Sequence, residues 1–297
     1  MSLRCLFPKG AMRFALVVAI ALGGGASPLL GEEMPGSGDA PSAAPSALGL
    51  QAYKENYFIY TRDYADHSRH AVQSQRQWVE ARFQFSLKSH ILHTRYFPLY
   101  FGYTQKSFWQ VFDEDGSRPF RENNYNPELF LMLFQNTRHP MQVGLWEHES
   151  NGQVISHSRS WDRYYLWPTY QFSPDVSMGF KYWWRYREDP KTSPEDPLGD
   201  ENPTILDYLG RFELSFNLAW QGSGLAGKIR KGRADPDGTY QLDYRFPAKW
   251  LFGWAQPVVT FSPKTHALFT YFYGYGESLI DYDESVKKAG LGVALDF

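Results

Sequence analysis

The sequence predicts an all-β protein: a transmembrane antiparallel β-barrel of about twelve strands. Aromatic residues make up 18% of the chain, with 20 Tyr, 22 Phe and 10 Trp. Yet the mean hydropathy is negative, and no segment beyond the amino terminus approaches a membrane-spanning helix in length and apolarity. Barrel strands reconcile these observations, because only every second residue faces lipid and aromatic side chains gather at the two interfaces.

Segments of alternating apolar and polar residues recur along the chain, separated by polar loops that contain Gly or Pro, which is the pattern of a β-meander. The longest predicted loops, 112–126 and 188–205, are acidic and fit the outward-facing ends of a barrel with short periplasmic turns. The predicted strands are residues 76–88, 99–111, 127–135, 142–150, 160–172, 176–187, 206–220, 225–230, 238–246, 258–262, 267–275 and 288–297.

The last predicted strand has one apolar face, formed by Ala289, Leu291, Val293, Leu295 and Phe297. A final strand of this kind that ends in Phe resembles the assembly signal of bacterial outer-membrane barrels. The alternative is a soluble sandwich whose last strand happens to end in Phe, and the leader and the aromatic content disfavour it.

The amino terminus predicts export. Arg4, Lys9 and Arg13 precede the apolar run 14–22 and the small residues 23–27, so residues 1–31 are expected to be a signal peptide cleaved between 26 and 31. Residues 32–50 are rich in Pro, Ser and Ala and predict a disordered leader, which leaves 51–297 for the barrel. Cys5 is the only cysteine, so the mature chain would hold neither disulfides nor thiolate metal sites. The net charge of −2 and the lack of a basic block argue against nucleic acid as a partner.

One predicted hairpin carries candidate catalytic residues. His148 and Ser150 are two residues apart, so on a strand both side chains point to the same face and can approach hydrogen-bonding distance. Asn151-Gly152 is typical of hairpins, and the polar run 153–158 allows the chain to return antiparallel. Asp162 would then lie beside His148 as its orienting acid, which completes a nucleophile, a base and an acid on one hairpin.

The surroundings of this hairpin indicate its substrate. Trp146 shares a face with His148 and Ser150, and a girdle Trp places that face toward lipid where the strand leaves the hydrocarbon. A serine nucleophile there would meet an ester at the glycerol level of a phospholipid. The spacing alone is weak evidence, because a strand His is more often a girdle or loop residue.

Several longer segments resemble one known family. They are 103–110 (YTQKSFWQ), 119–122 (PFRE) with Asn124-Tyr125, 148–152 (HESNG), 158–161 (SRSW) and 274–282 (GYGESLIDY). In this order and together, they make the chain resemble outer-membrane phospholipase A from about residue 56 to residue 297, with a looser match over 175–257.

The resemblance implies a serine hydrolase that acts on acyl esters, at sn-1 and sn-2, of phospholipids and lysophospholipids in the bacterial outer membrane. Ser150 would be the nucleophile, and His148 the base that takes its proton and returns it to the leaving alcohol. Asp162 falls at the third catalytic position, where the family has Asn. An aspartate would hold the same imidazole tautomer, although an unpaired charge is costly at a membrane-facing surface.

The resemblance also implies Ca²⁺ as the cofactor, held by oxygen ligands. The corresponding positions are the Ser158 side chain, the Gln153 backbone carbonyl and the backbone carbonyl of Ser117 from a second subunit. Bound Ca²⁺ and the Gly152 N–H would together form an oxyanion hole, so the active state would be a homodimer. Ile155 stands where the family has an acidic residue suited to a second calcium position, which makes a second site doubtful.

Two further polar segments have competing interpretations. Gln105 corresponds to a family residue whose hydrogen bonds cross the dimer interface, whereas the residues alone favour a lumen-facing Gln in an internal polar network. The run 113–117 superficially suggests a calcium loop, but its Gly comes too early for an EF-hand and Asn124 stands at position twelve of that template. A solvated loop is therefore expected at 113–117.

Two other classes of function stay open. The first is a passive porin or channel, in which His148 and Ser150 are girdle residues. The second is a structural or adhesive barrel that acts through its long acidic loops.

Another polar cluster has a structural interpretation. Glu277 and Asp281 could be offered as glycosidase acids, but no sugar-binding cleft is implied. Together with Arg82, Arg121 and Glu122, they are instead expected to pair charges inside the barrel lumen.

Overall fold

The computed structural model describes residues 49–65, 78–92, 94, 96–155, 157–193, 196, 199–251, 262 and 264–296. The predicted signal peptide and almost all of the predicted leader lie outside these residues. Among the described residues, no helix is long and apolar enough to cross a membrane.

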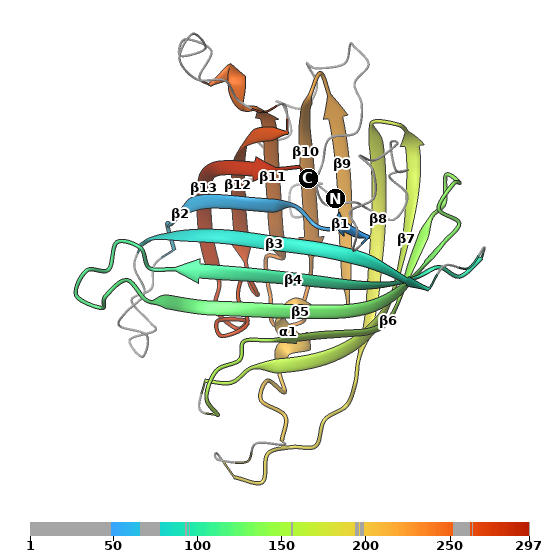
Figure 1. The fold of residues 1–297 in the computed structure, drawn as a ribbon. Helices are drawn as coiled ribbons and strands as arrows, with labels where there is room; N and C mark the ends of the chain where they lie inside the picture. Colours follow the sequence, from blue (N-terminus) through green and yellow to red (C-terminus); the bar gives the residue numbers. More distant parts are fainter. Residues whose placement is uncertain are drawn as a thin grey trace, which may run out of the picture.

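Within the described residues, thirteen strands form one antiparallel sheet that closes on itself. From β2 onward, successive strands pair with one another, and β13 pairs back to β2, so the sheet is a closed barrel (Figure 1). The strands are β1 (Leu50–Ala52), β2 (Asn56–Asp63), β3 (Val79–Leu92), β4 (Leu99–Trp109), β5 (Phe120–Leu133), β6 (Met141–Ser150), β7 (Ser160–Ser173), β8 (Val176–Arg185), β9 (Phe212–Trp220), β10 (Ser223–Arg230), β11 (Thr239–Pro247), β12 (Thr265–Gly274) and β13 (Val286–Leu295).

The first two strands share one place in the barrel. β1 pairs with residues 87–89 of β3, and β2 pairs with residues 79–84 of the same strand. Residues 53–55 interrupt what is otherwise a single strand along β3. The described barrel therefore has twelve strand positions, which confirms the predicted fold class and strand number.

The strands of the structure differ from the predicted strands in one place. β2 precedes every predicted strand, and the sequence analysis does not identify it, because its polar residues Asn56, Thr61 and Asp63 interrupt the apolar pattern. These three side chains are buried, and Thr61 and Asp63 alternate with exposed Tyr60 and Arg62. The predicted strand 258–262 lies outside the described residues except for Ser262, which is not in a strand.

The predicted loop 112–126 is too long, because β5 begins at Phe120. Glu122, Asn124 and Asn126 are buried at alternate positions of β5. A barrel whose lumen is polar places hydrophilic residues on its inner face, so a polar stretch does not by itself indicate a loop. The connection between β4 and β5 is therefore only 110–119.

The predicted strand 206–220 is also wrong in its first part. Residues Ile205–Leu209 form the short helix α1, and β9 begins only at Phe212. Pro203 precedes the helix by two residues, where a missing N–H costs no helical hydrogen bond. Ile205 and Leu209 are four residues apart, so both lie on one face of the helix, and both are buried.

α1 fills part of the lumen. In Figure 1 it lies behind β5, inside the ring of strands. A single buried cluster joins α1 to strands β7 and β8 and to the β12–β13 loop, and its members are Trp161, Tyr165, Trp167, Trp183, Ile205, Leu209, Leu279 and Tyr282. The lumen is therefore plugged at this level by apolar side chains.

Ion pairs fill another part of the lumen, and they form the plug of the barrel together with the apolar cluster. Glu277, Asp281, Arg121 and Arg82 take part in them, as expected. Arg82 Nη1 lies 2.7 Å from Glu277 Oε1, and Arg121 pairs with Asp281 and, at 2.9 Å, with Glu80. All of these side chains are buried. Glu122 accepts hydrogen bonds there from Asn124 and from the backbone N–H of Ile280. These contacts tie the β12–β13 loop to the inner wall.

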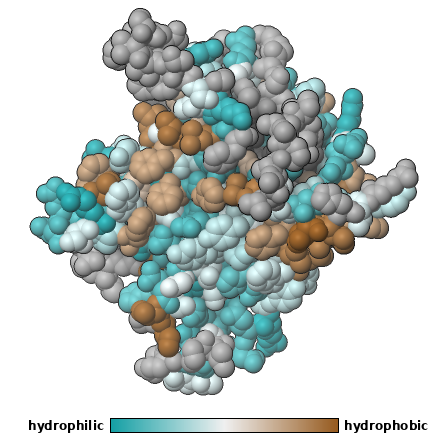
Figure 2. Space-filling model, in the orientation of Figure 1, coloured by the Kyte–Doolittle hydropathy of each residue, from teal (hydrophilic) through white to brown (hydrophobic). Residues whose placement is uncertain are grey.

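The outer surface is apolar along the strands. Figure 2 shows one side of it, with apolar side chains gathered over β2 and near one end of β3. In β13, Leu291, Val293 and Leu295 are exposed while Lys288, Gly290 and Ala294 are buried, as the alternation predicts. Exposed large apolar residues on other strands include Phe85, Phe101, Leu145, Trp146, Tyr164, Leu166, Tyr170 and Phe180.

Candidate active site

β6 and β7 form the predicted hairpin. Their register places His148 directly opposite Asp162, and Ser150 opposite Ser160. Buried Asn151 closes the connecting loop 151–159: its Oδ1 accepts the backbone N–H of Arg159 at 2.9 Å, and its Nδ2 donates to the His157 carbonyl at 2.9 Å. The loop is therefore fixed where it leaves β6.

A β-bulge in β6 reverses the faces of that strand. Before the bulge, Gln142 and Gly144 are buried toward the lumen. The pairing register shifts between Gly144 and Glu147, and beyond the shift Glu147 is the buried residue. One extra residue has exchanged the two faces, because side chains alternate along a strand.

This exchange positions the candidate catalytic pair. Leu145 and Trp146 are consecutive and both exposed, which marks the bulge. After it, His148 and Ser150 share the outward face with Trp146, while Glu147 and Glu149 take the inward one. An unbulged β6 would turn His148 and Ser150 into the lumen.

Asp162 holds the imidazole of His148. Nδ1 of His148 lies 3.1 Å from Asp162 Oδ1, and the Trp146 indole N–H donates to the same oxygen at 2.7 Å. The rings of Trp146 and His148 stack, with centroids 6.0 Å apart and an angle of 15° between their planes. A carboxylate that accepts from Nδ1 selects the tautomer whose Nε2 is free to act as a base.

Ser150 is the last residue of β6 and lies between Tyr125 of β5 and Ser160 of β7. Gly152 follows with φ of +63°, a conformation that favours glycine. A Cβ at Gly152 would lie 3.2 Å from the Tyr125 ring, so the turn also packs closely against β5.

An open groove lies on the outer face beside this pair. It is lined by Trp146, His148, Asp162, Tyr186, Arg187 and Glu188. Tyr186 is attached to the hairpin, because its backbone N–H donates to the Asp162 carbonyl at 2.8 Å. The start of the 186–204 loop thus forms one wall of the groove.

Ser158 meets a carboxylate that the sequence analysis does not select. Its Oγ donates to Glu201 Oε2 at 2.7 Å, and Ser160 Oγ donates to the same oxygen at 3.4 Å. Gln153 is exposed in the same loop as Ser158. Ile155, which replaces an acid of the family pattern, is 41% exposed.

Ser117 lies in a different connection, 110–119, at the same end of the barrel. It is exposed and has φ of +60°. Asp113 stabilises this turn itself, since its Oδ1 accepts the Gly116 N–H at 3.0 Å and its carbonyl accepts the Arg118 N–H at 2.7 Å. The segment 113–117 is thus a turn capped by its own carboxylate, in keeping with the expected solvated loop.

Gln105 faces outward, and not into the lumen. It alternates with buried Thr104 on β4, and its Nε2 donates to Ser107 Oγ at 3.1 Å while its Oε1 accepts from Tyr103 OH at 3.2 Å. The lumen-facing alternative for Gln105 is therefore wrong. Its partners on the neighbouring strands are Phe85 and Tyr125.

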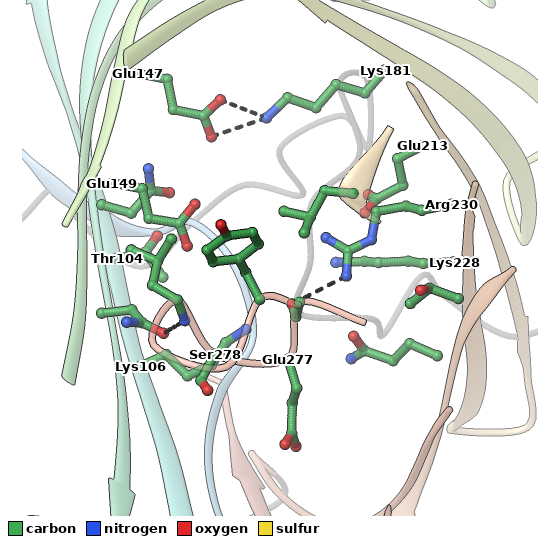
Figure 3. Close-up of a pocket in the computed structure, with 18 of the residues that line it drawn as sticks. Thr104, Lys106, Glu147, Glu149, Lys181, Glu213, Lys228, Arg230, Glu277 and Ser278 are labelled. Atoms are coloured by element: carbon green, nitrogen blue, oxygen red, sulfur yellow. Dashed lines mark hydrogen bonds and ion pairs between the residues drawn. The ribbon is translucent and has the colours of Figure 1, made fainter. Parts of the chain in front are cut away.

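A separate polar cavity of about 160 Å³ lies inside the barrel. Figure 3 shows cationic and anionic side chains pointing into it from opposite walls, including Lys106, Lys228, Glu149 and Glu213. None of the three candidate catalytic residues lines it. The groove and this cavity are therefore on opposite faces of the barrel wall.

The sequence analysis recovers the His148–Asp162 contact but misses three neighbours. Trp146 is recognised only as a girdle residue, although its indole donates to Asp162. Arg187 and Glu201 come from a loop far along the chain, and no local spacing links them to the hairpin. Only the fold brings that loop over the β6–β7 end.

Comparisons with known proteins place the chain in a family. A sequence model of the family described as Phospholipase A1 matches residues 39–295. The phospholipase A1 of Escherichia coli strain K12 is 31% identical over 271 residues, which covers 83% of this chain and 81% of that protein. A putative phospholipase A1 of Neisseria meningitidis is 31% identical over 240 residues, covering 75% and 56%.

Solved structures give the same result. The outer-membrane phospholipase A of Escherichia coli superposes with a TM-score of 0.70 at 27% identity, covering 86% of this chain and 94% of that one. A Salmonella typhi outer-membrane phospholipase, a dimer with bound calcium, has a TM-score of 0.70 at 26% identity, covering 85% and 94%. The chain belongs to the phospholipase A1 family and is an ester hydrolase of the bacterial outer membrane.

Proposed function

We propose that this phospholipase is calcium-dependent and cleaves acyl esters at sn-1 and sn-2 of phospholipids and lysophospholipids, with Ser150, His148 and Asp162 as its catalytic residues. The observation that carries the proposal is the outward-facing His148, whose Nδ1 lies 3.1 Å from Asp162 while Ser150 shares its face. An outward site suits a substrate that stays in the membrane, because the lipid need not enter a pocket.

The hydrogen bond to Asp162 leaves Nε2 of His148 as the base. As Ser150 Oγ forms a bond to the ester carbonyl carbon, its proton passes to Nε2, and Asp162 stabilises the imidazolium. The bond between that carbon and the glycerol oxygen then breaks, and Nε2 returns the proton to the departing alcohol. Water attacks the acyl-serine with the same base, which releases the fatty acid and regenerates Ser150.

The Gly152 N–H is proposed as one oxyanion donor. Its left-handed backbone, with φ of +63°, turns the chain immediately after Ser150, so the donor follows the nucleophile closely. A preorganised N–H of this kind stabilises the negative oxygen of the tetrahedral intermediate.

We assign the Ser158 hydroxyl, the Gln153 carbonyl and the Ser117 carbonyl of a second subunit as calcium ligands. The donor set fits a hard cation, since it is built of oxygen atoms and the Ser158 hydroxyl already lies 2.7 Å from a carboxylate oxygen. When bound, Ca²⁺ supplies a positive charge that polarises a water molecule near the oxyanion.

The proposed active state is a homodimer, as in the Salmonella typhi relative. Gln105 is available for an interface within the membrane, because it lies on the outer face of β4 between apolar and aromatic neighbours. The amide would find partners there on the second subunit, where lipid tails offer none.

The test uses the mature chain refolded in detergent micelles with phospholipids labelled at either acyl position. Wild type should release both fatty acids in Ca²⁺ and lose this activity in EDTA, while Ser150→Ala should reduce it by about 10³-fold or more. Equal rates for wild type and Ser150→Ala would remove the proposed mechanism. Conductance across a planar bilayer without hydrolysis would point to a passive channel.

A further inference from the structure

One cation lies in the outer groove beside His148. Arg187 is exposed there, and it is the only arginine or lysine among the described residues that line the groove. The two carboxylates of the groove are already engaged, since Asp162 holds the His148 imidazole and Glu188 pairs with Arg185 at 3.1 Å. Within the part of the chain that the structure describes, Arg187 itself has no carboxylate partner. Its charge is therefore available to an anion that enters the groove.

Tyr186 holds the backbone of Arg187 at the groove. The Tyr186 N–H donates to the Asp162 carbonyl at 2.8 Å, and the Tyr186 hydroxyl donates to the Leu145 carbonyl at 3.4 Å. Its ring also packs edge-on against the ring of Tyr164, with centroids 5.4 Å apart. The residue before Arg187 is thus fixed to both strands of the catalytic hairpin, so Arg187 starts from a defined place beside them.

The groove has an apolar end and a cationic end. β6 and β8 run toward the same end of the barrel, and Trp146 precedes His148 on β6, so Trp146 lies nearer the middle of the membrane. Tyr186 lies level with Asp162, because its N–H donates to the Asp162 carbonyl. Arg187 is the next residue after β8 has ended, so it lies nearer the loop end than Asp162 does. The catalytic imidazole therefore stands between an indole and a guanidinium.

A phospholipid in a membrane presents its groups in the same order. Its acyl chains lie in the hydrocarbon, its esters at the glycerol level, and its phosphate on the headgroup side of the esters. The same glycerol carries the phosphate and the reacting ester, so a lipid whose ester lies at His148 brings its phosphate toward Arg187. A guanidinium binds phosphate oxygens through two parallel N–H···O bonds. A long arginine side chain also places its charge at the headgroup level while its methylene groups stay on apolar surface.

We propose that Arg187 is a specificity-determining residue that binds the phosphate of the phospholipid substrate in the outer groove. The inference rests on the proposed function of Ser150 and His148 and adds recognition of the phosphate to it. Arg187 makes and breaks no bond of the ester. It selects esters that carry a phosphate over uncharged esters, which offer no group to the guanidinium.

Two substitutions of Arg187 separate the charge from the shape of the side chain. Arg187→Gln removes the charge and keeps a polar side chain. Arg187→Lys keeps the charge but loses the bidentate fork, so it should lose less activity than Arg187→Gln. The matched control is Arg211→Gln. Arg211 is an exposed arginine at the same end of the barrel, next to the start of β9, and it does not line the groove.

The measurement is kcat/KM of the full mature chain on two substrates, in the same uncharged detergent micelles with saturating Ca²⁺. One substrate is a short-chain phosphatidylcholine, and the other is the uncharged p-nitrophenyl ester of the same acyl chain. Relative to wild type, Arg187→Gln should lower kcat/KM on phosphatidylcholine by about tenfold and on the uncharged ester by less than about twofold. The loss should lie mainly in KM, because the phosphate does not react. Arg211→Gln should match wild type on both substrates.

Two results would overturn the role of Arg187. Equal losses on both substrates would show that Arg187 supports the shape of the groove, and unchanged values on both would show that the phosphate is held elsewhere. Heat-modifiable gel mobility verifies that each variant is folded.

The outcome is separable from that of the proposed function. If Ser150→Ala is inactive on both substrates while Arg187→Gln matches wild type, only the role of Arg187 fails. If Ser150→Ala hydrolyses both substrates as fast as wild type, the proposed catalytic residues fail, whatever Arg187→Gln does.

Discussion

The Trp146 indole donates to Asp162 Oδ1 at 2.7 Å, a shorter contact than the 3.1 Å between that oxygen and the His148 imidazole. One carboxylate oxygen therefore serves two donors on the outer face of the barrel. A charged acid at a membrane-facing position is costly without partners. The indole offsets part of that cost, which makes an aspartate tolerable where the family pattern has asparagine.

We predict that Asp162→Asn retains most of the wild-type activity. The Asn Oδ1 can still accept from Trp146 and His148, so the imidazole keeps its tautomer and only the charge is lost. The measurement is kcat on a short-chain phospholipid in micelles. A loss as deep as that of Ser150→Ala would show that the charge itself is required.

Trp146→Phe should lower kcat by up to about tenfold, because Asp162 loses one of two donors and holds His148 less firmly. The same substitution in an Asp162→Asn background should cost less, since a neutral amide needs less compensation. Trp184→Phe is the control, because Trp184 stacks on Tyr164 of the neighbouring strand. Equal losses for Trp146→Phe in both backgrounds would indicate a packing effect alone.

Glu147→Gln should destabilise the barrel by about 3 kcal/mol, since removing one partner of a buried ion pair leaves the other charges uncompensated. Glu147 is buried and pairs with Arg163 at 2.6 Å and Lys181 at 3.0 Å. Denaturant unfolding followed by gel mobility gives the free energy of unfolding. Glu114→Gln, which breaks an exposed pair with Arg118, should leave that free energy nearly unchanged.

The free energy of unfolding should fall in acid, because the ion pairs in the lumen lose a charge. Burial alone would raise the pKa of Glu277, but the charges of Lys288 and Arg82 hold it below its ordinary value. Because the folded pKa is lowered, the stabilisation is complete above the unfolded pKa of about 4.3 and is lost as pH falls through the folded pKa. Glu277→Gln should reduce the pH dependence of the unfolding free energy below about pH 5. An unchanged slope would contradict this assignment.

Alternation predicts the barrel well where the outer face is strongly apolar. β13 follows its predicted faces, because its lipid-facing row leaves a clear period of two. β6 and β7 also pair as predicted, although a bulge interrupts the alternation of β6. The prediction fails at β2 and at the start of β5. There the lumen is lined by polar side chains, and such a strand has the composition of a loop.

The sequence by itself determined the class of fold and the pairing of His148 with Asp162, since these depend on local alternation and on neighbouring segments, and its motifs carried the resemblance to the family. Only the tertiary structure decided how Trp146 joins Asp162 and that Glu201 reaches Ser158. It also showed the bulge between Gly144 and Glu147, which turns His148 and Ser150 outward. The physical reason is that two consecutive apolar residues fit either face, and only pairing with both neighbouring strands fixes the register.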